Sequence, residues 1–198
     1  LMNCARESVR RSSDITFLGV DLASTGGDAS VYVSIDDEGN VFDIEHTSNM
    51  PMTDAMGRIR ELDGYYDYTR IMVDSTSLGQ GTVDQVRESL GNKVEGFKFT
   101  NEKKQSLYNT LKNDLQSGSI AFEYIPGKND MPGNKMMNQC LDLEYSYTST
   151  GRMKISHPPN GHDDFSDALA LAVWARSRKM FARSDKDSMR PFTLGSLR

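Results

Sequence analysis

Residues 15–35 read ITFLGVDLASTGGDASVYVSI, and this stretch decides the fold class. Residues 15–22 are a short apolar run with the length of a buried strand. Residues 29–35 alternate apolar and polar side chains, as a half-buried strand does. Gly26 and Gly27, which lie between the two runs, suit a tight hairpin turn. The stretch therefore predicts two antiparallel strands at the start of a sheet.

The sequence on the C-terminal side of this hairpin extends the sheet. Residues 36–40, DDEGN, form a turn signal, and a third strand is expected at residues 41–46. Further along, helical and strand-like patterns alternate: helix 51–64 ended by Gly64, strand 70–74, helix 80–90, strand 94–99 and helix 101–116. Such alternation is typical of parallel strands. We expect an α/β fold whose mixed sheet has an antiparallel meander of three strands followed by parallel strands, flanked by helices.

The last third of the chain adds a loop, a hairpin and a buried helix. Residues 124–135, YIPGKNDMPGNK, are rich in Pro, Gly and Asn and predict a loop. A short helix is expected at 136–143, and residues 144–148 and 152–156 are expected to pair as a hairpin. Residues 163–179 contain the run ALALAVWA, which is apolar on all sides. A helix with that pattern must be buried.

Length and composition indicate one globular domain. The chain has 198 residues, of which 26% are charged and 37% hydrophobic, values that are ordinary for a soluble α/β domain. We expect a polar linker at 1–14, the domain at 15–180 and a basic tail without predicted structure at 181–198. No apolar run approaches the roughly 20 residues of a membrane span, and no secretory signal is recognisable. A cytoplasmic setting is expected, with Cys4 and Cys140 as free thiols.

The charge of the chain is distributed unevenly. The formal net charge is −5, which by itself does not suggest a nucleic-acid partner. Residues 1–92 hold 7 basic and 16 acidic side chains, whereas residues 93–154 hold 9 and 7, and residues 155–198 hold 7 and 5. Residues 176–198 alone carry 7 basic and 2 acidic side chains. This asymmetry would let one face meet DNA, although solubility explains the acidic half equally well.

Aspartates stand at three places where a chemical site is expected. Asp21 and Asp74 each end an apolar strand, and ligands of open α/β sheets bind at the carboxyl ends of the strands. Asp163, Asp164 and Asp167 open the last helix, where spacings of three and four residues place them on one face. These acids can therefore converge on one crevice.

Taken singly, most of these aspartates have a structural explanation, because a strand end or a helix start accepts an aspartate as a cap. Asp167 does not, since a carboxylate entering an apolar helix is costly to bury without a cation or donors. Carboxylate oxygens suit Mg²⁺ or Mn²⁺. The sequence has no phosphate-binding loop, since residues 24–28, STGGD, contain no lysine. Together these features favour phosphodiester hydrolysis with two metal ions.

The order of these features resembles that of the RNase H-like superfamily. Within the RuvC-like branch of this superfamily, it resembles the nuclease domain of a viral, phage-type terminase large subunit. Three blocks carry the resemblance, which covers about residues 17–175: FLGVDLASTGGDASVYV from residue 17, IMVDSTSLGQGTVDQV from residue 71 and GHDDFSDALALAVWA from residue 161. The third block, with its HDD-x-x-DALA pattern, is the most specific of the three.

The resemblance assigns a role to each acid. It implies that Asp21 bridges two metal ions, that Asp74 binds one of them, and that Asp164 with Asp167 completes the other. Family members differ over the last motif, so Asp163 stays a candidate ligand.

Two further residues receive roles by position. His162 is a candidate as well, with a place at the helix entry favoured over ligation. Lys104 matches a basic position that would touch DNA phosphate, and a solvated helix lysine is an equal alternative.

The implied function is that of a metal-dependent endonuclease that cleaves double-stranded viral DNA during genome packaging in the host cytoplasm. Implied partners are the terminase ATPase domain, the small subunit and the portal. No Walker A motif is present, so the ATPase domain is absent from this sequence and residues 1–14 would be a linker remnant. Alternatives are a RuvC-like junction resolvase or related nuclease, and a nucleic-acid-binding module of the same fold without catalysis.

Overall fold

A computed structural model describes residues 2–23, 29–76, 80–147, 153–159 and 161–188. Its centre is a five-stranded sheet in the order β4-β3-β2-β5-β6. The strands are β2 (Thr16–Asp21), β3 (Ala29–Asp36), β4 (Val41–Ser48), β5 (Arg70–Asp74) and β6 (Val94–Phe97). The first three pair antiparallel, whereas β2, β5 and β6 run parallel. The predicted mixed sheet is thereby confirmed.

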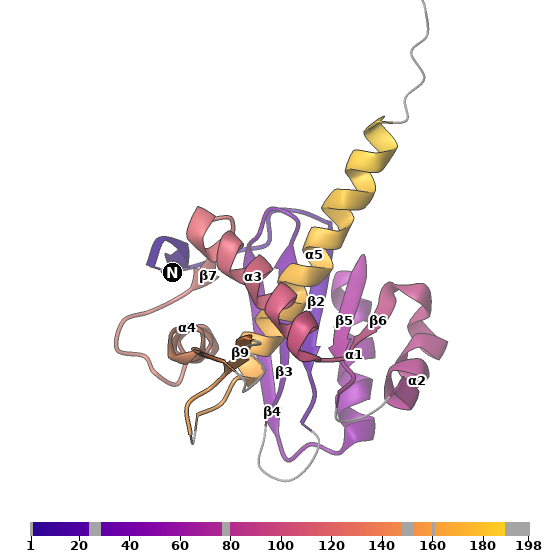
Figure 1. Ribbon diagram of the computed structural model, residues 1–198. Coiled ribbons are helices and arrows are strands. Elements are labelled where there is room, and N and C mark those ends of the chain that lie inside the picture. The colour runs from indigo at the N-terminus through magenta and orange to yellow at the C-terminus, as the bar shows by residue number, and fades with distance from the viewer. Residues whose placement is uncertain (1, 24–28, 77–79, 148–152, 160, 189–198) are drawn as a thin grey trace, which may run out of the picture.

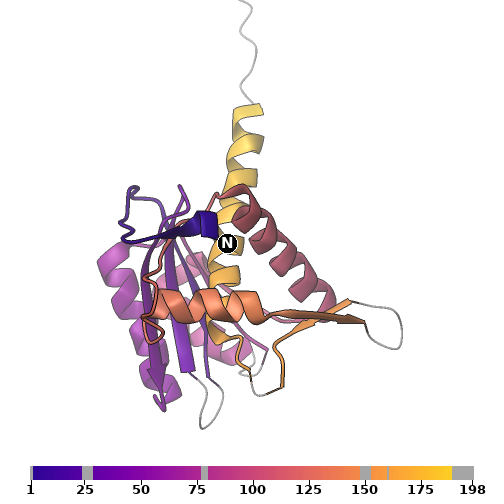
Figure 2. The ribbon, with the colours of Figure 1, turned by 90° about the vertical axis from the view of Figure 1, so that its left-hand side faces the viewer.

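Helices cover both faces of this sheet (Figures 1 and 2). One face carries α1 (Met52–Tyr66) and α2 (Gln80–Leu90), and the other carries α3 (Asn101–Ser117), α4 (Pro132–Asp142) and α5 (Asp164–Ser188). The shorter elements are η1 (Met2–Cys4), β1 (Ala5–Arg6), η2 (Gly91–Lys93), β7 (Phe122–Glu123) and the predicted hairpin of β8 (Glu144–Tyr147) and β9 (Met153–Ser156). Among the described helices, none is long and apolar enough to cross a membrane.

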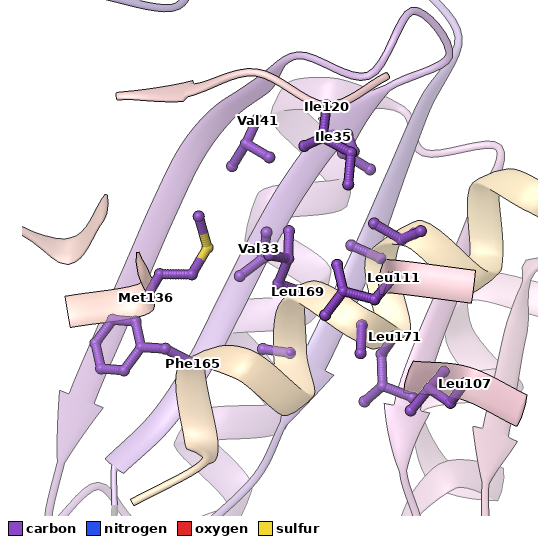
Figure 3. Close-up of a cluster of buried hydrophobic side chains, with 14 of the residues drawn as sticks. Val33, Ile35, Val41, Leu107, Leu111, Ile120, Met136, Phe165, Leu169 and Leu171 are labelled. Atoms are coloured by element: carbon purple, nitrogen blue, oxygen red, sulfur yellow. The ribbon is translucent and has the colours of Figure 1, made fainter. Parts of the chain in front are cut away.

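The central strand β2 supplies both halves of the core because its side chains alternate between the two faces. Leu18 and Val20 pack with α1 and α2, whereas Phe17 packs with α3, α4 and α5. Figure 3 shows side chains of the second half, among them Val33 of β3, Leu107 of α3 and Leu169 of α5. The sheet is therefore covered on both sides, as an apolar parallel strand requires.

Gly19 lets α5 lie directly against β2. A Cβ atom at this position would be 2.1 Å from the carbonyl oxygen of Ala168 and 2.3 Å from the backbone nitrogen of Ala172. Only a residue without a side chain permits this approach of helix and strand. The residues of α5 from Phe165 to Val173 are buried all round, as the apolar run predicted.

Several element boundaries differ from the sequence-based expectation, and the clearest differences are in helices. Gly64 does not end α1, which continues to Tyr66 and stops where Asp67 adopts a left-handed conformation with φ 48°. The expected loop at 124–135 is shorter, because α4 begins at Pro132, a residue whose fixed φ suits the first helical turn. The last helix runs to Ser188, beyond its expected end at residue 179.

The expected linker at 1–14 packs against the domain at its beginning. Strand β1 pairs in parallel with β7, a strand that the sequence did not suggest. Cys4 is fully buried, and its thiol donates a hydrogen bond of 3.3 Å to the carbonyl oxygen of Leu115. Both cysteines are free thiols, as expected. The predicted turn at Gly26 and Gly27 and the end of the tail, residues 189–198, lie outside the described residues.

Candidate metal centre

Two of the predicted site residues lie side by side at the carboxyl end of the sheet. Strand β2 ends at Asp21 and the adjacent parallel strand β5 ends at Asp74. Their register pairs Val20 with Val73, so the two aspartates occupy equivalent positions one residue later. The buried β2 and β5 residues before them hold the two carboxylates at the same edge.

The third element of the site is the beginning of α5. The side-chain oxygen of Gln139 accepts hydrogen bonds from the backbone nitrogens of Phe165 and Ser166, at 2.8 and 3.3 Å, and thus caps the first turn. The backbone nitrogen of Asp167 donates to the carbonyl oxygen of Asp163 at 2.7 Å. Because α5 lies against β2 at Gly19, its acidic first turn reaches the strand ends.

The other four acids all lie near enough to Asp21 to affect its ionisation. The pKa of Asp21 is raised well above its ordinary value, first by burial and then by the negative charges of Asp167, Asp74, Asp164 and Asp163. Like charges oppose the ionised form most strongly where water is excluded. The structure thus brings together every aspartate that the sequence analysis singled out.

Asp74 is held by a neighbour that the sequence analysis missed. Its Oδ1 atom accepts hydrogen bonds from the backbone nitrogen of Thr76 at 2.8 Å and from the Thr76 hydroxyl at 2.6 Å. The same hydroxyl accepts a bond of 2.8 Å from the backbone nitrogen of Phe99. Burial raises the pKa of Asp74, and the bonds from Thr76 act in the opposite direction. The D-x-T spacing is a turn signal that could have indicated this contact.

Lys104 lies inside the acidic cluster and not on a solvated helix face. Its Nζ atom is 2.9 Å from Asp163 Oδ2 and 3.2 Å from Asp167 Oδ2, and only 19% of its side chain is exposed. Burial alone would lower the pKa of Lys104, but the two carboxylates outweigh it, and the pKa is raised. Lys104 is therefore a charged ammonium that partly compensates the negative charge of the acids.

Tyr108 is the second residue that sequence reasoning missed. It lies one turn after Lys104 on α3, is 2% exposed, and its hydroxyl donates a hydrogen bond to Asp167 Oδ1. Asp167 itself is 6% exposed. Burial raises the pKa of Asp167 to about 7, against the opposing effect of Lys104. The only available signal was the four-residue spacing of Lys104 and Tyr108, which matches that of Asp163 and Asp167.

The two histidines near the cluster lie at its rim. His162 is 62% exposed, with Nδ1 3.9 Å from Asp164 Oδ2. His157, which sequence reasoning did not single out, has Nε2 3.9 Å from Asp163 Oδ1 and is 40% exposed. These distances exceed hydrogen-bond length, so both rings are neighbours of the acids at the open side of the site.

The donor set fits a hard divalent cation. Within the described part of the chain, no group of three or more His, Cys, Asp or Glu side chains is arranged so that it could hold a metal ion. The Lys104 ammonium is bound by Asp163 and Asp167 instead. The donors at this place are nonetheless carboxylate oxygens, which suit Mg²⁺ or Mn²⁺. Burial and, after it, the negative charges of the neighbouring acids raise the pKa of Asp21, and a bound cation would offset that repulsion.

Asp167 should make the stability of the metal-free protein depend on pH. Its pKa is about 7 in the folded state, against an ordinary value of 3.8, so the folded state binds the proton more tightly than the unfolded chain. The stabilisation that protonated Asp167 contributes is complete below pH 4 and is lost as the pH rises through 7. We expect the melting temperature in EDTA to fall across this range. Asp167→Asn should flatten the fall, and an unchanged slope in this variant would contradict the assignment.

The mixed sheet carries acids at the ends of β2 and β5, and further acids stand at the start of α5. This combination defines an RNase H-like domain. The chain belongs to the terminase RNase H-like domain family, whose sequence profile matches residues 18–176. No curated protein matches the sequence.

Solved structures of phage terminases share this fold. The large terminase nuclease of thermophilic phage G20c with bound magnesium has a TM-score of 0.70 and 21% identity, over 84% of each chain. The mutant nuclease domain of gp2 of bacterial virus Sf6, with manganese and beta-thujaplicinol, has a TM-score of 0.65 and 14% identity, over 82% of this chain and 87% of that one. A large terminase from a thermophilic bacteriophage has a TM-score of 0.63 and 9% identity, over 87% of this chain and 41% of that chain.

Proposed function

We propose that this domain is a metal-dependent endonuclease that cleaves double-stranded viral DNA by two-metal phosphodiester hydrolysis during genome packaging. The observation that carries the proposal is the convergence of Asp21, Asp74, Asp163, Asp164 and Asp167 from three elements on one place. Family membership and the similar fold of solved terminase nucleases that contain magnesium or manganese support it.

Each acid has a proposed part in this reaction. Asp21 would bridge two ions, Asp74 would hold one, and Asp164 with Asp167 would hold the other. Bound divalent ions would activate water and stabilise the leaving oxygen. Asp163 stays a candidate ligand, and we expect the Lys104 ammonium that contacts it to turn to a DNA phosphate when the ions occupy the acids.

The proposed partners follow from the same family. Double-stranded DNA is the substrate, and the ATPase domain, the small subunit and the portal are the assembly in which cutting would take place. This chain matches 41% of the length of one solved large terminase, and such a match is consistent with a role as one domain of a longer protein. A RuvC-like junction resolvase is the alternative that shares such acids, and a preference for branched over linear duplex would distinguish it.

A plasmid-nicking assay tests the proposal. The domain is incubated with supercoiled plasmid in Mg²⁺, in Mn²⁺ and in EDTA. We expect nicked and linear products with either ion and none in EDTA. Absence of cleavage with both ions, in a sample that is folded by circular dichroism, would overturn the proposal and favour the non-catalytic alternative.

The DNA-free domain should bind metal weakly. Mg²⁺ keeps several waters and usually takes one or two protein carboxylates plus substrate phosphate oxygens, so the second ion should need the scissile phosphate. Calorimetric titration is expected to find at most one tight ion. Activity at low metal concentration should be higher with Mn²⁺ than with Mg²⁺, and Ca²⁺ should bind without turnover. Two tightly bound Mg²⁺ ions in the absence of DNA would count against this description.

A further inference from the structure

Helices α3 and α5 face each other with two matched pairs of side chains. Lys104 and Tyr108 are four residues apart on α3 and lie on one face of that helix. Asp163 directly precedes α5, and Asp167 lies four residues later in its first turn. Lys104 contacts both acids, and Tyr108 contacts Asp167. The hydroxyl of Ser166, 3.1 Å from the Tyr108 hydroxyl, donates to the Asp163 carbonyl oxygen at 2.9 Å and completes the network.

The two oxygens of Asp167 have different partners. Oδ2 accepts from the Lys104 ammonium at 3.2 Å, and Oδ1 accepts from the Tyr108 hydroxyl. The ammonium is positively charged and sits on a flexible stem, so a divalent cation repels it and it can swing away. The phenol is neutral, and its ring is packed in the core with 2% exposure, so it has no comparable freedom to leave.

On this basis we propose that Tyr108 is a positioning residue for the metal centre. Its hydroxyl occupies Oδ1 of Asp167 with a hydrogen bond. Only Oδ2 is then left to exchange the Lys104 ammonium for a metal ion. The inference rests on the proposed function, because it assumes that Asp167 is a metal ligand. Hydrogen bonds from neighbours to ligating carboxylates commonly orient them and tune the metal.

The consequence is a preference between ions. A carboxylate restricted to one oxygen suits Mg²⁺, which requires nearly ideal octahedral geometry. A carboxylate that offers both oxygens suits Ca²⁺, which accepts bidentate ligands and higher coordination numbers. Loss of the Tyr108 hydroxyl should therefore weaken Mg²⁺ binding more than Ca²⁺ binding.

The test compares Tyr108→Phe with wild type in the DNA-free 198-residue chain, by calorimetric titration with Mg²⁺, Mn²⁺ and Ca²⁺. We expect the Mg²⁺ affinity to fall by about tenfold and the ratio of Ca²⁺ to Mg²⁺ affinity to rise. The matched control is Tyr68→Phe, which removes a phenol that is 1% exposed and lies 2.6 Å from the Ser34 hydroxyl in the core on the opposite face of the sheet. Its metal affinities should equal those of wild type. An unchanged Ca²⁺ to Mg²⁺ ratio in Tyr108→Phe would overturn the inference.

A second variant tests the other donor and needs no change in the core. Lys104→Met removes the exchanging ammonium, so it should raise the Mg²⁺ affinity in the same titration, opposite in sign to Tyr108→Phe. A lowered affinity would refute the exchange, even if Tyr108→Phe does not fold. Failure of the proposed function looks different: the folded wild-type domain would then not nick plasmid with either Mg²⁺ or Mn²⁺, whatever the two α3 variants do in the titration.

Discussion

Asp21→Asn is expected to abolish DNA cleavage and to leave the domain folded. The Asp21 carboxylate is half-buried at the end of β2 and lies within electrostatic reach of the other four acids, a position from which one side chain could serve two cations. A neutral amide is a poor bridge between cations. If about 4 kcal/mol of transition-state stabilisation is lost, the nicking rate falls by about 10³-fold. Plasmid nicking in Mg²⁺ and in Mn²⁺ measures this rate.

The same variant should be at least as stable as wild type without metal. Burial and four like charges raise the pKa of Asp21, so its ionised form is unfavourable in the folded protein, and an amide removes that repulsion. The control is Asp14→Asn, which makes the same chemical change at a fully exposed position in an ion pair with Arg11. It should nick at the wild-type rate. A folded Asp21→Asn protein with near wild-type nicking would refute the assignment.

Gly19→Ala is expected to destabilise the domain severely. The added Cβ would lie 2.1 Å from the Ala168 oxygen and 2.3 Å from the Ala172 nitrogen, both of them backbone atoms of α5 that cannot rotate away. Overpacking of a core commonly costs about 1–3 kcal/mol, and displacement of a whole helix should reach or exceed the top of that range. Urea unfolding of the purified domain measures the loss in free energy of unfolding.

The matched control for this change is Gly57→Ala. Gly57 lies inside α1, where a new Cβ would have no neighbour within 4 Å. Alanine is favoured over glycine inside a helix by about 0.5–1 kcal/mol, so this variant should be more stable than wild type. The same substitution thus has opposite signs at two positions. A Gly19→Ala protein as stable as wild type would mean that α5 does not lie against β2 at this glycine.

The acids of the site were predictable because each depends on a local pattern. Asp21 and Asp74 end apolar strands, and Asp163, Asp164 and Asp167 have the spacing of one helix face. Strand ends and helix faces are properties of short segments, and general rules of α/β sheets bring strand ends together. The acids could therefore be assigned to one crevice before any contact between them was known.

The partners of the acids were not predictable in this way. Tyr108 and Lys104 meet Asp167 only because α3 packs against α5, and the two contacts join residues that are 59 and 63 positions apart. In the sequence both residues look like ordinary members of an amphipathic helix. The same limit applies to β1 and β7, whose pairing at Ala5 and Phe122 depends on a parallel neighbour remote in sequence.

The sequence by itself determined the order of the main strands and helices, the burial of the last helix and the positions of the five candidate acids, because periodicity and strand length report on segments of ten to twenty residues. The tertiary structure decided which donor each carboxylate oxygen of Asp167 receives and how closely α5 approaches Gly19. These features depend on the distance and rotation between packed elements. That geometry is set by the joint packing of side chains from many segments, which no single stretch of sequence specifies.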